Sequence, residues 1–338
     1  MRWEDWPLLE HGGGLRAAAE RYGIPLGDWL DLSTGINPQG WLVPPIPATI
    51  WQRLPEPGDG LEAAAAACYG TESLLPVAGS QAAIQALPLL REPGRVGVLS
   101  PSYAEHAHAW RRAGHRVEEL PAESLDATVD RLDTLVLVHP NNPTGVRFPS
   151  DGLLDWRERL AGRGGWLVVD EAFIDPTPEG SLAHHVGPPG LIVLRSLGKF
   201  FGLAGARVGF VLAAPAVLEG LREQLGPWAV TGPSRWVAAR ALSDRAWQAE
   251  TRIRLDREGN RLADLLKRQG LPVAGGTGLF QWVPLPDAAF WQDALARRGI
   301  LVRRFADPPG LRFGLPGGEL AWRRLELALA GVRAERLR

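Results

Sequence analysis

Five short apolar runs in the middle of the sequence constrain the fold more than any other feature. Each is five or six residues long, and they stand at 95–100, 134–139, 166–170, 191–196 and 207–212. This is the usual length of a buried strand. Helical stretches such as 105–113 and 152–161 separate several of them. Because strands that alternate with helices form parallel sheets with both faces covered, we expect a large α/β domain.

The rest of the chain predicts a second, smaller domain. The charged, periodic segment 235–268 is typical of one long helix or two, and 279–283, 300–303 and 311–314 have the pattern of three strands flanked by helices. This order indicates a small α+β domain. We expect an N-terminal arm at 1–45 that packs with the small domain and the active site, a large domain at 46–240 and a small domain at 241–338.

Charge and cysteine content narrow the classes of partner. The 37 basic and 38 acidic residues give a net charge of −1 without long blocks of one sign, which argues against a nucleic-acid or membrane surface. We expect a small-molecule substrate, and no metal site is predicted. The single cysteine, Cys68, and the lack of an apolar stretch in residues 1–10 favour the cytoplasm.

Three polar motifs follow three of the apolar runs. They are Asn-Asn-Pro-Thr-Gly at 141–145, Asp170-Glu171, and Ser-Leu-Gly-Lys at 196–199. Ligands of open α/β sheets bind outside the carboxyl ends of the strands. The three motifs are therefore expected to line one pocket.

Lys199 is the candidate nucleophile. The chain has only two lysines, and Lys199 lies among apolar residues whereas Lys267 stands in a charged helix. A buried amine with a lowered pKa can form a Schiff base with an aldehyde cofactor. The alternative is an ordinary surface lysine.

Asp170 follows four apolar residues, and burying its carboxylate without a partner would be costly. Bound to a pyridinium nitrogen, it would be paired and would keep that nitrogen protonated, so that the ring withdraws electrons. A helix N-cap or a structural ion pair is the alternative interpretation.

An anion site is predicted from five further positions. Arg207 lies among glycines eight residues after Lys199, and Ser196 can share the same anion. The backbone of Gly79-Ser80-Gln81 offers N–H groups at a helix start, which commonly bind phosphate, although such a pair is also common in turns. Tyr103 would present a ring for stacking on a pyridine, or else belong to the core.

Together these motifs resemble the fold-type I pyridoxal-phosphate enzymes, in the branch that contains histidinol-phosphate aminotransferase and threonine-phosphate decarboxylase. The resemblance implies a large domain with a mainly parallel seven-stranded sheet, a homodimer, and pyridoxal 5'-phosphate (PLP) as cofactor. It implies that Asn142 contacts the ring hydroxyl, with Lys199 and Asp170 as catalytic residues. The cofactor-binding residues implied are Gly79, Ser80, Gln81, Tyr103, Asn142, Asp170, Ser196, Lys199 and Arg207.

Several segments resemble the decarboxylases of cobalamin synthesis in particular. These are His-Gly-Gly-Gly at 11–14, the segments 31–38 and 170–175, and Pro227-Trp228. The resemblance implies decarboxylation of L-threonine O-3-phosphate to (R)-1-amino-2-propanol O-2-phosphate. His11, Gly12 and Arg303 would bind the substrate phosphate and Arg312 the α-carboxylate. Gly35 and Asn142 complete the implied substrate-binding set.

Three positions depart from the related patterns. Phe173 replaces a tyrosine that aminotransferases usually carry, Leu54 replaces a tyrosine that reaches across the dimer, and Gly35 replaces an asparagine. Three alternatives also stay open. They are an aminotransferase acting on a phosphorylated amino acid such as histidinol phosphate, a non-catalytic PLP-binding regulator, and an α/β protein in which the motifs are accidental.

Overall fold

The computed structural model describes residues 9–336, so residues 1–8 of the predicted arm lie outside it. The chain divides into two compact units. Among the described residues, the large unit comprises 36–260 and 276–279, and the small unit comprises 9–35, 261–275 and 280–336. The division into arm, large domain and small domain stays a prediction.

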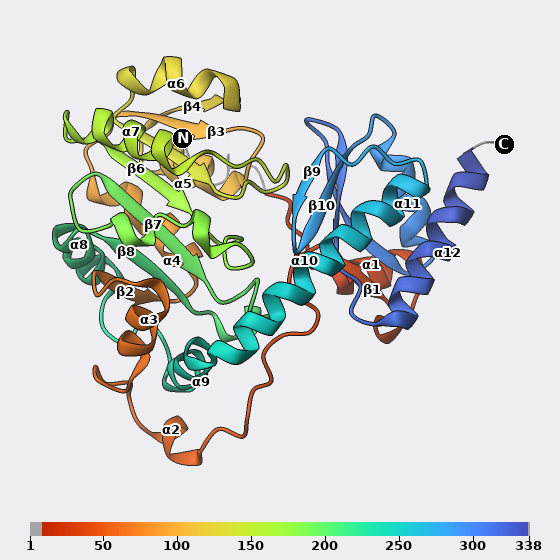
Figure 1. The fold of residues 1–338 in the computed structure, drawn as a ribbon, viewed down its shortest axis with the longest axis horizontal. Coiled ribbons are helices and arrows are strands. Elements are labelled where there is room, and N and C mark those ends of the chain that lie inside the picture. Colours follow the sequence, from red (N-terminus) through yellow and green to blue (C-terminus); the bar gives the residue numbers. More distant parts are fainter. Residues whose placement is uncertain (1–8, 337–338) are drawn as a thin grey trace. The chain divides into compact units, whose positions relative to one another are not determined.

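A sheet of seven strands, counted over residues 9–336, forms the centre of the large unit (Figure 1). The strand order is β2-β8-β7-β6-β5-β3-β4, and β8 runs antiparallel to both of its neighbours while the strands from β7 to β4 run parallel. The mainly parallel α/β sheet predicted from the sequence is confirmed. The strands are β2 (Leu74–Val77), β3 (Arg95–Leu99), β4 (Arg116–Leu120), β5 (Thr134–Val138), β6 (Trp166–Asp170), β7 (Leu191–Ser196) and β8 (Gly209–Ala213).

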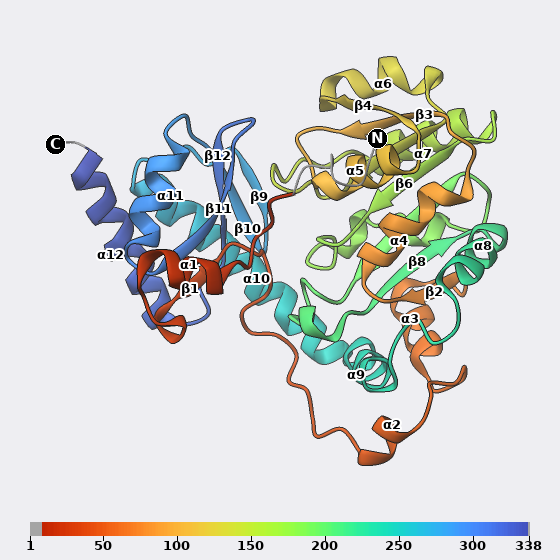
Figure 2. The same cartoon turned by 180° about the vertical axis from the view of Figure 1, so that it is seen from behind.

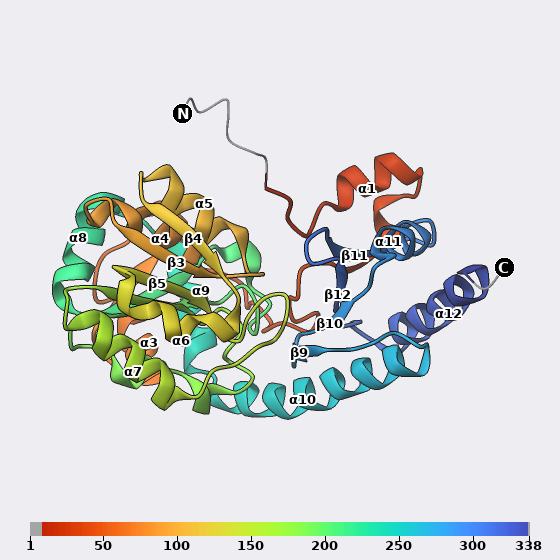
Figure 3. The ribbon, with the colours of Figure 1, turned by 90° about the horizontal axis from the view of Figure 1, so that it is seen from above.

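Helices cover both faces of this sheet (Figure 3). On one face, α4, α5 and α8 pack on Val136 and Val168 in a buried cluster that includes Trp110 and Leu221. The helix α7 lies on the opposite face. Strands buried on both sides must be apolar throughout, which explains the uninterrupted runs in the sequence. The helices are α2 (Ala48–Gln52), α3 (Leu61–Tyr69), α4 (Ser80–Ala86), α5 (Ala104–Arg112), α6 (Leu125–Thr128), α7 (Ser150–Ala161), α8 (Pro215–Leu225), α9 (Gly232–Ser243) and α10 (Arg245–Arg268).

The small unit is built on a second sheet, with the strand order β1-β11-β12-β10-β9 (Figure 2). The strand β1 pairs with β11 in parallel, and the pairs β11–β12 and β12–β10 are antiparallel. The three strands expected near the C-terminus correspond to β10, β11 and β12. The strands of this sheet and the helices of the unit are α1 (Leu15–Tyr22), β1 (Leu30–Leu32), β9 (Gly275–Thr277), β10 (Phe280–Pro284), α11 (Ala288–Ala296), β11 (Ile300–Phe305), β12 (Gly310–Gly314) and α12 (Glu319–Arg336). Of the β9 residues, only Gly275 is grouped with the small unit.

The charged segment that starts at residue 235 contains two helices. The first, α9, begins after Thr231, whose hydroxyl accepts a hydrogen bond from the amide of Ser234 as an N-cap. The second is the 24-residue α10. None of the helices between residues 9 and 336 combines the length and apolar character needed to cross a lipid bilayer.

Candidate active site

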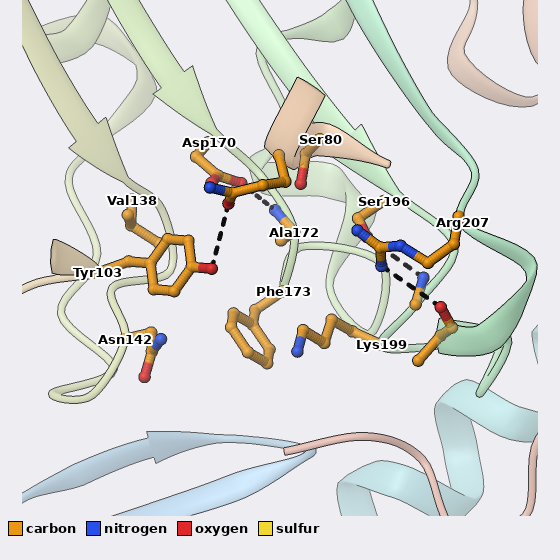
Figure 4. A pocket seen from close by; sticks show the side chains of 13 residues that line it. Ser80, Tyr103, Val138, Asn142, Asp170, Ala172, Phe173, Ser196, Lys199 and Arg207 are labelled. Carbon is orange, nitrogen blue, oxygen red and sulfur yellow. Dashed lines mark hydrogen bonds between the residues drawn. The ribbon is translucent and has the colours of Figure 1, made fainter. Parts of the chain in front are cut away.

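The parallel strands β5, β6 and β7 of the large unit end at the same edge of the sheet. In the pairing register, Asp170 at the end of β6 stands opposite Val138 of β5 on one side and Leu194 of β7 on the other. Asn142 follows β5, and Lys199 follows β7. These side chains line a single pocket (Figure 4). Its lining comprises Ser80, Gln81, Tyr103, Val138, Asn142, Asp170, Ala172, Phe173, Ser196, Gly198, Lys199, Ala204 and Arg207.

The antiparallel strand β8 brings Arg207 to the same edge of the sheet. Its first residue, Gly209, pairs with Val77 at the end of β2 and with Ser196 at the end of β7. Because β8 starts where its neighbours end, Arg207 lies beside both Gly79 and Ser196. A single reversed strand therefore gathers residues from three segments at one end of the pocket.

At this end of the pocket, the corner formed by Gly79, Ser196 and Arg207, the backbone leaves no room for additional side-chain atoms. A Cβ at Gly209 would lie 2.6 Å from the amide nitrogen of Ser80, and one at Gly79 would lie 2.7 Å from Nη2 of Arg207. Arg207 itself has a φ of 52°, an unfavourable value for a residue other than glycine. Such strain is typical of functional sites, where the surrounding structure holds a side chain in place.

This corner fits a phosphate group. The guanidinium of Arg207, the Ser196 hydroxyl and the Ser80 amide converge there, and all three are suitable donors to a phosphate oxygen. Glycine at 79 and 209 lets the backbone approach closely. Further along the pocket, Tyr103 offers an aromatic face, and the Asp170 carboxylate suits a protonated ring nitrogen. The residues present therefore fit a planar, phosphorylated pyridine such as PLP.

Asp170 is held by two hydrogen bonds. Its Oδ1 accepts from the backbone amide of Ala172 at 3.0 Å, and its Oδ2 lies 3.0 Å from Nε2 of His106. Both Asp170 and His106 are almost fully buried. His106 was not predicted from the sequence, although it follows Tyr103 by three residues and helical spacing brings the two rings within 6.1 Å.

Lys199 lies next to an aromatic ring. Its Nζ is 5.4 Å from the ring centre of Phe173 (Figure 4), the position where a tyrosine is usual in aminotransferases. The backbone around the lysine is fixed by the segment that enters the large unit, because the amide of Asn37 donates to the carbonyl oxygen of Lys199 at 3.0 Å. The side-chain amide of Asn37 donates to the carbonyl of Phe200 at 2.8 Å.

A buried ion cluster stabilises the segment that carries Asp170 and Phe173. Arg195 of β7 forms a salt bridge with Glu171 at 2.9 Å and another with Asp175. Glu171 also accepts from the Ser181 hydroxyl at 2.6 Å. Burial raises the pKa of Glu171, and Arg195 opposes that rise. The cluster ties residues 170–175 to the strand that leads to Lys199.

The small unit contains a second, polar pocket. Among its lining residues are His11, Gly12 and Arg303, together with Arg21, Ser33 and Gln292, which were not predicted. Arg303 donates to the carbonyl oxygens of Glu10 and His11 at 2.6 and 3.3 Å. A Cβ at Gly12 would lie 2.4 Å from the carbonyl oxygen of Ser33, so the glycine run allows the chain to pack closely there.

Arg312 lies on β12 of the same unit and is buried. It donates to the carbonyl oxygen of Ser33. Burial, together with the nearby charge of Arg303, lowers the pKa of Arg312 to about 9. A guanidinium keeps its proton in proteins, so Arg312 carries a buried positive charge. This environment therefore favours an anionic ligand that compensates the charge. Gly35, the last residue of the first segment of the small unit, has a φ of 62°, in the left-handed region that favours glycine.

The predicted site residues thus fall into two groups. The residues predicted to bind the cofactor all belong to the large unit. Asn142, which was predicted for both the cofactor and the substrate, is among them. His11, Gly12, Gly35, Arg303 and Arg312 belong to the small unit.

Comparison with known proteins identifies the family. The profile of the aminotransferase class I and II family matches residues 56–321. Threonine-phosphate decarboxylase of Pseudomonas aeruginosa is 59% identical over 326 residues, which cover 96% of this chain and 98% of that protein. Threonine-phosphate decarboxylase of a Sinorhizobium species is 43% identical over 95% of this chain and 98% of that one.

A solved structure shares the fold. Histidinol-phosphate aminotransferase of Sinorhizobium meliloti, in complex with pyridoxal-5'-phosphate, superposes with a TM-score of 0.84 at 21% identity and covers 98% of this chain and 96% of its own. The profile match and the similarity over nearly the whole length agree with the geometry of the pocket. The chain belongs to the threonine-phosphate decarboxylases, within the aminotransferase class I and II family.

Proposed function

We propose that this chain is a PLP-dependent enzyme that decarboxylates L-threonine O-3-phosphate to (R)-1-amino-2-propanol O-2-phosphate and CO2, for the synthesis of cobalamin. The observation that carries the proposal is the single pocket lined by Lys199, Asp170, Asn142, Ser196 and Arg207. The 59% identical relative, which bears the name of this activity, supports the choice of reaction.

The large unit provides the cofactor contacts. Lys199 would hold the aldehyde carbon of PLP, Asn142 the ring hydroxyl and Asp170 the ring nitrogen. Gly79, Ser80, Ser196 and Arg207 would hold the phosphate, with Gln81 and Tyr103 completing the pocket. When bound, the protonated pyridine ring supplies an electron sink for the bond that breaks at Cα.

Asp170, Lys199 and Phe173 would each have a separate role in the reaction. The buried Asp170, bonded to His106 and to the Ala172 amide, would place its carboxylate at the ring nitrogen. Lys199 delivers a proton to Cα after CO2 has left. Phe173 presents carbon atoms beside the lysine amine, so this side of the pocket lacks the hydroxyl that a tyrosine would add.

The small unit provides charges that match the substrate. His11, Gly12 and Arg303 would bind its phosphate, and Arg312 would bind its α-carboxylate. A phosphate is costly to desolvate unless charged donors replace water, and Arg303 is such a donor. Gly35 has no side chain, so it would contribute through its backbone.

One assay separates this reaction from the alternative. The purified, PLP-loaded protein is incubated with L-threonine O-3-phosphate and no keto acid, while CO2 and product are followed by mass spectrometry. Stoichiometric CO2 and aminopropanol phosphate over many turnovers are expected. A single conversion of the cofactor to its amine form, with turnover only after a keto acid is added, would instead identify an aminotransferase.

We further infer that the enzyme is a homodimer. Several large apolar side chains of the large unit are exposed, among them Leu42 (87%), Trp51 (66%), Leu54 (63%) and Trp228 (58%). A contiguous patch of exposed apolar side chains marks an interface, and we propose that these four side chains belong to one. Light scattering during gel filtration tests the inference, and a monomer at micromolar concentration contradicts it.

We also propose a cytoplasmic location, which the single cysteine of the chain supports.

A further inference from the structure

A chain of two hydrogen bonds connects Glu105, which stands outside the pocket lining, to Tyr103, which belongs to it. The side-chain amide of Gln81 donates from Nε2 to Oε2 of Glu105 at 2.7 Å. The hydroxyl of Tyr103 donates to Oε1 of the same Gln81 at 3.2 Å. Gln81 is the second residue of α4, after Ser80, and Glu105 is the second residue of α5, after Ala104.

The direction of these bonds follows from the chemistry of Glu105. A carboxylate only accepts hydrogen bonds, so the group of Gln81 that faces it must be the NH2. The carbonyl oxygen of Gln81 then faces Tyr103, and it too can only accept. The tyrosine hydroxyl must therefore direct its proton toward Gln81 rather than toward a bound ligand.

We propose that Glu105 is a positioning residue that fixes the ring orientation and hydroxyl direction of Tyr103 through Gln81. Tyr103 then presents its ring face to a planar ligand, and its hydroxyl does not donate to that ligand. The assignment deepens the proposed function, on which it rests, because the planar ligand is the PLP ring.

Two further observations agree with this role. Burial, followed by the negative charges of Glu105 and Asp170, raises the pKa of Tyr103 to about 12, so the phenol keeps the proton that it donates. The helices on which Gln81 and Glu105 stand also share one buried apolar cluster, which fixes the two helices relative to each other. Packed backbone therefore supports both ends of the array.

The first test uses protein without cofactor. The chain has three tyrosines, so a sample labelled with [4-13C]tyrosine gives one Cζ signal each for Tyr22, Tyr69 and Tyr103, assigned with Tyr103→Phe. In Glu105→Gln the new amide can donate or accept, so Gln81 can reverse and the Tyr103 signal should move or split. The control Glu223→Gln removes an exposed charge of the same unit and should leave the signal unchanged. An unchanged Tyr103 signal in Glu105→Gln overturns the proposal.

The second test measures how fast bound PLP is released. One lost hydrogen bond corresponds to a release about three- to tenfold faster in Glu105→Gln. Gln81→Met should have a similar effect, and the double variant should release PLP no faster than Gln81→Met alone. If Glu105→Gln accelerates release equally in the Gln81→Met background, Glu105 acts without Gln81 and the proposal is wrong. Failure of the unmodified protein to bind PLP would contradict the proposed function, whereas the tyrosine spectrum would still test Glu105.

Discussion

Gly79 and Arg207 are so close that the glycine has no space for a side chain. A Cβ at Gly79 would lie 2.7 Å from Nη2 of the arginine, and the φ of Gly79 is 72°. The two residues come from different parts of the chain and meet because β8 reverses direction between β2 and β7. The contact fixes the guanidinium at the corner that we assign to the cofactor phosphate.

Substitution Gly79→Ala should therefore weaken PLP binding by about tenfold or more, through backbone strain and displacement of Arg207. Gly58→Ala is a matched control, because Gly58 has a φ of 86° but no atom lies within 4 Å of its Cβ position. Titration of the cofactor-free variants with PLP, followed by absorbance, measures both. Equal affinities for the two variants would show that the contact with Arg207 is unimportant.

Only one of the two lysines should hold the cofactor. Reduction of the PLP-loaded protein with borohydride is expected to attach PLP to Lys199 and leave Lys267 unmodified, as read by peptide mass spectrometry. Lys199→Ala should abolish turnover, and Lys267→Ala should retain it, since Lys267 lies near the end of α10. Label on Lys267 would refute the assigned nucleophile.

Removing the partner of Asp170 should affect the cofactor ring. His106→Leu leaves a buried carboxylate without its 3.0 Å imidazole partner, and a hydrogen bond to a charged group is worth about 1.5–3 kcal/mol, or about 10- to 100-fold in kcat. The 15N signal of the pyridine nitrogen in labelled PLP should shift toward the unprotonated form. His106→Gln should restore part of the effect, and His108→Leu, on the same helix, should not alter the 15N signal.

Stability should depend on the protonation of His139. Burial, with a smaller contribution from the charge of Arg147, lowers the pKa of this imidazole from 6.5 to about 4. The unfolded chain therefore binds more protons between these values, and the free energy of unfolding falls as the pH drops from 6.5 to 4, by about 3 kcal/mol from this group. In His139→Gln, calorimetry should show a weaker loss of thermal stability over that range. Identical slopes for the two proteins would contradict the prediction.

The phosphate contact of Arg303 can be tested by comparing substrates. Arg303→Leu should raise KM for L-threonine O-3-phosphate about 10- to 100-fold, because it removes a charge-assisted donor. Inhibition by L-threonine, which lacks the phosphate, should be unchanged. An equal loss for both compounds would place the effect elsewhere than at the phosphate.

Much of the large unit could be predicted because its chemistry stands at the ends of buried strands. The runs at β5, β6 and β7 are mainly apolar, and polar residues stand at or just after the end of each. Two strands of the seven-stranded sheet, β2 and β4, were not predicted. Pro76 interrupts the pattern of β2, and the edge strand β4 carries exposed residues such as Glu118 and Glu119, so neither has the pattern of a buried strand.

The supporting residues His106 and Glu105 were not predicted, since their role depends on contacts between distant parts of the chain. His106 is one of seven histidines, and its bond to Asp170 spans 64 positions. Glu105 and Gln81 are 24 positions apart. Helical spacing from Tyr103 was the one available signal for His106, because residues three apart share a helix face.

The distribution of site residues over two compact units also has an evolutionary consequence. The residues assigned to the cofactor lie between positions 79 and 207. The residues assigned to the substrate, apart from Asn142, lie in the segments at the two ends of the chain. Mutations that alter substrate preference can therefore accumulate in the terminal segments without disturbing the central one. A lineage could in this way acquire new phosphorylated substrates while it inherits an intact cofactor site.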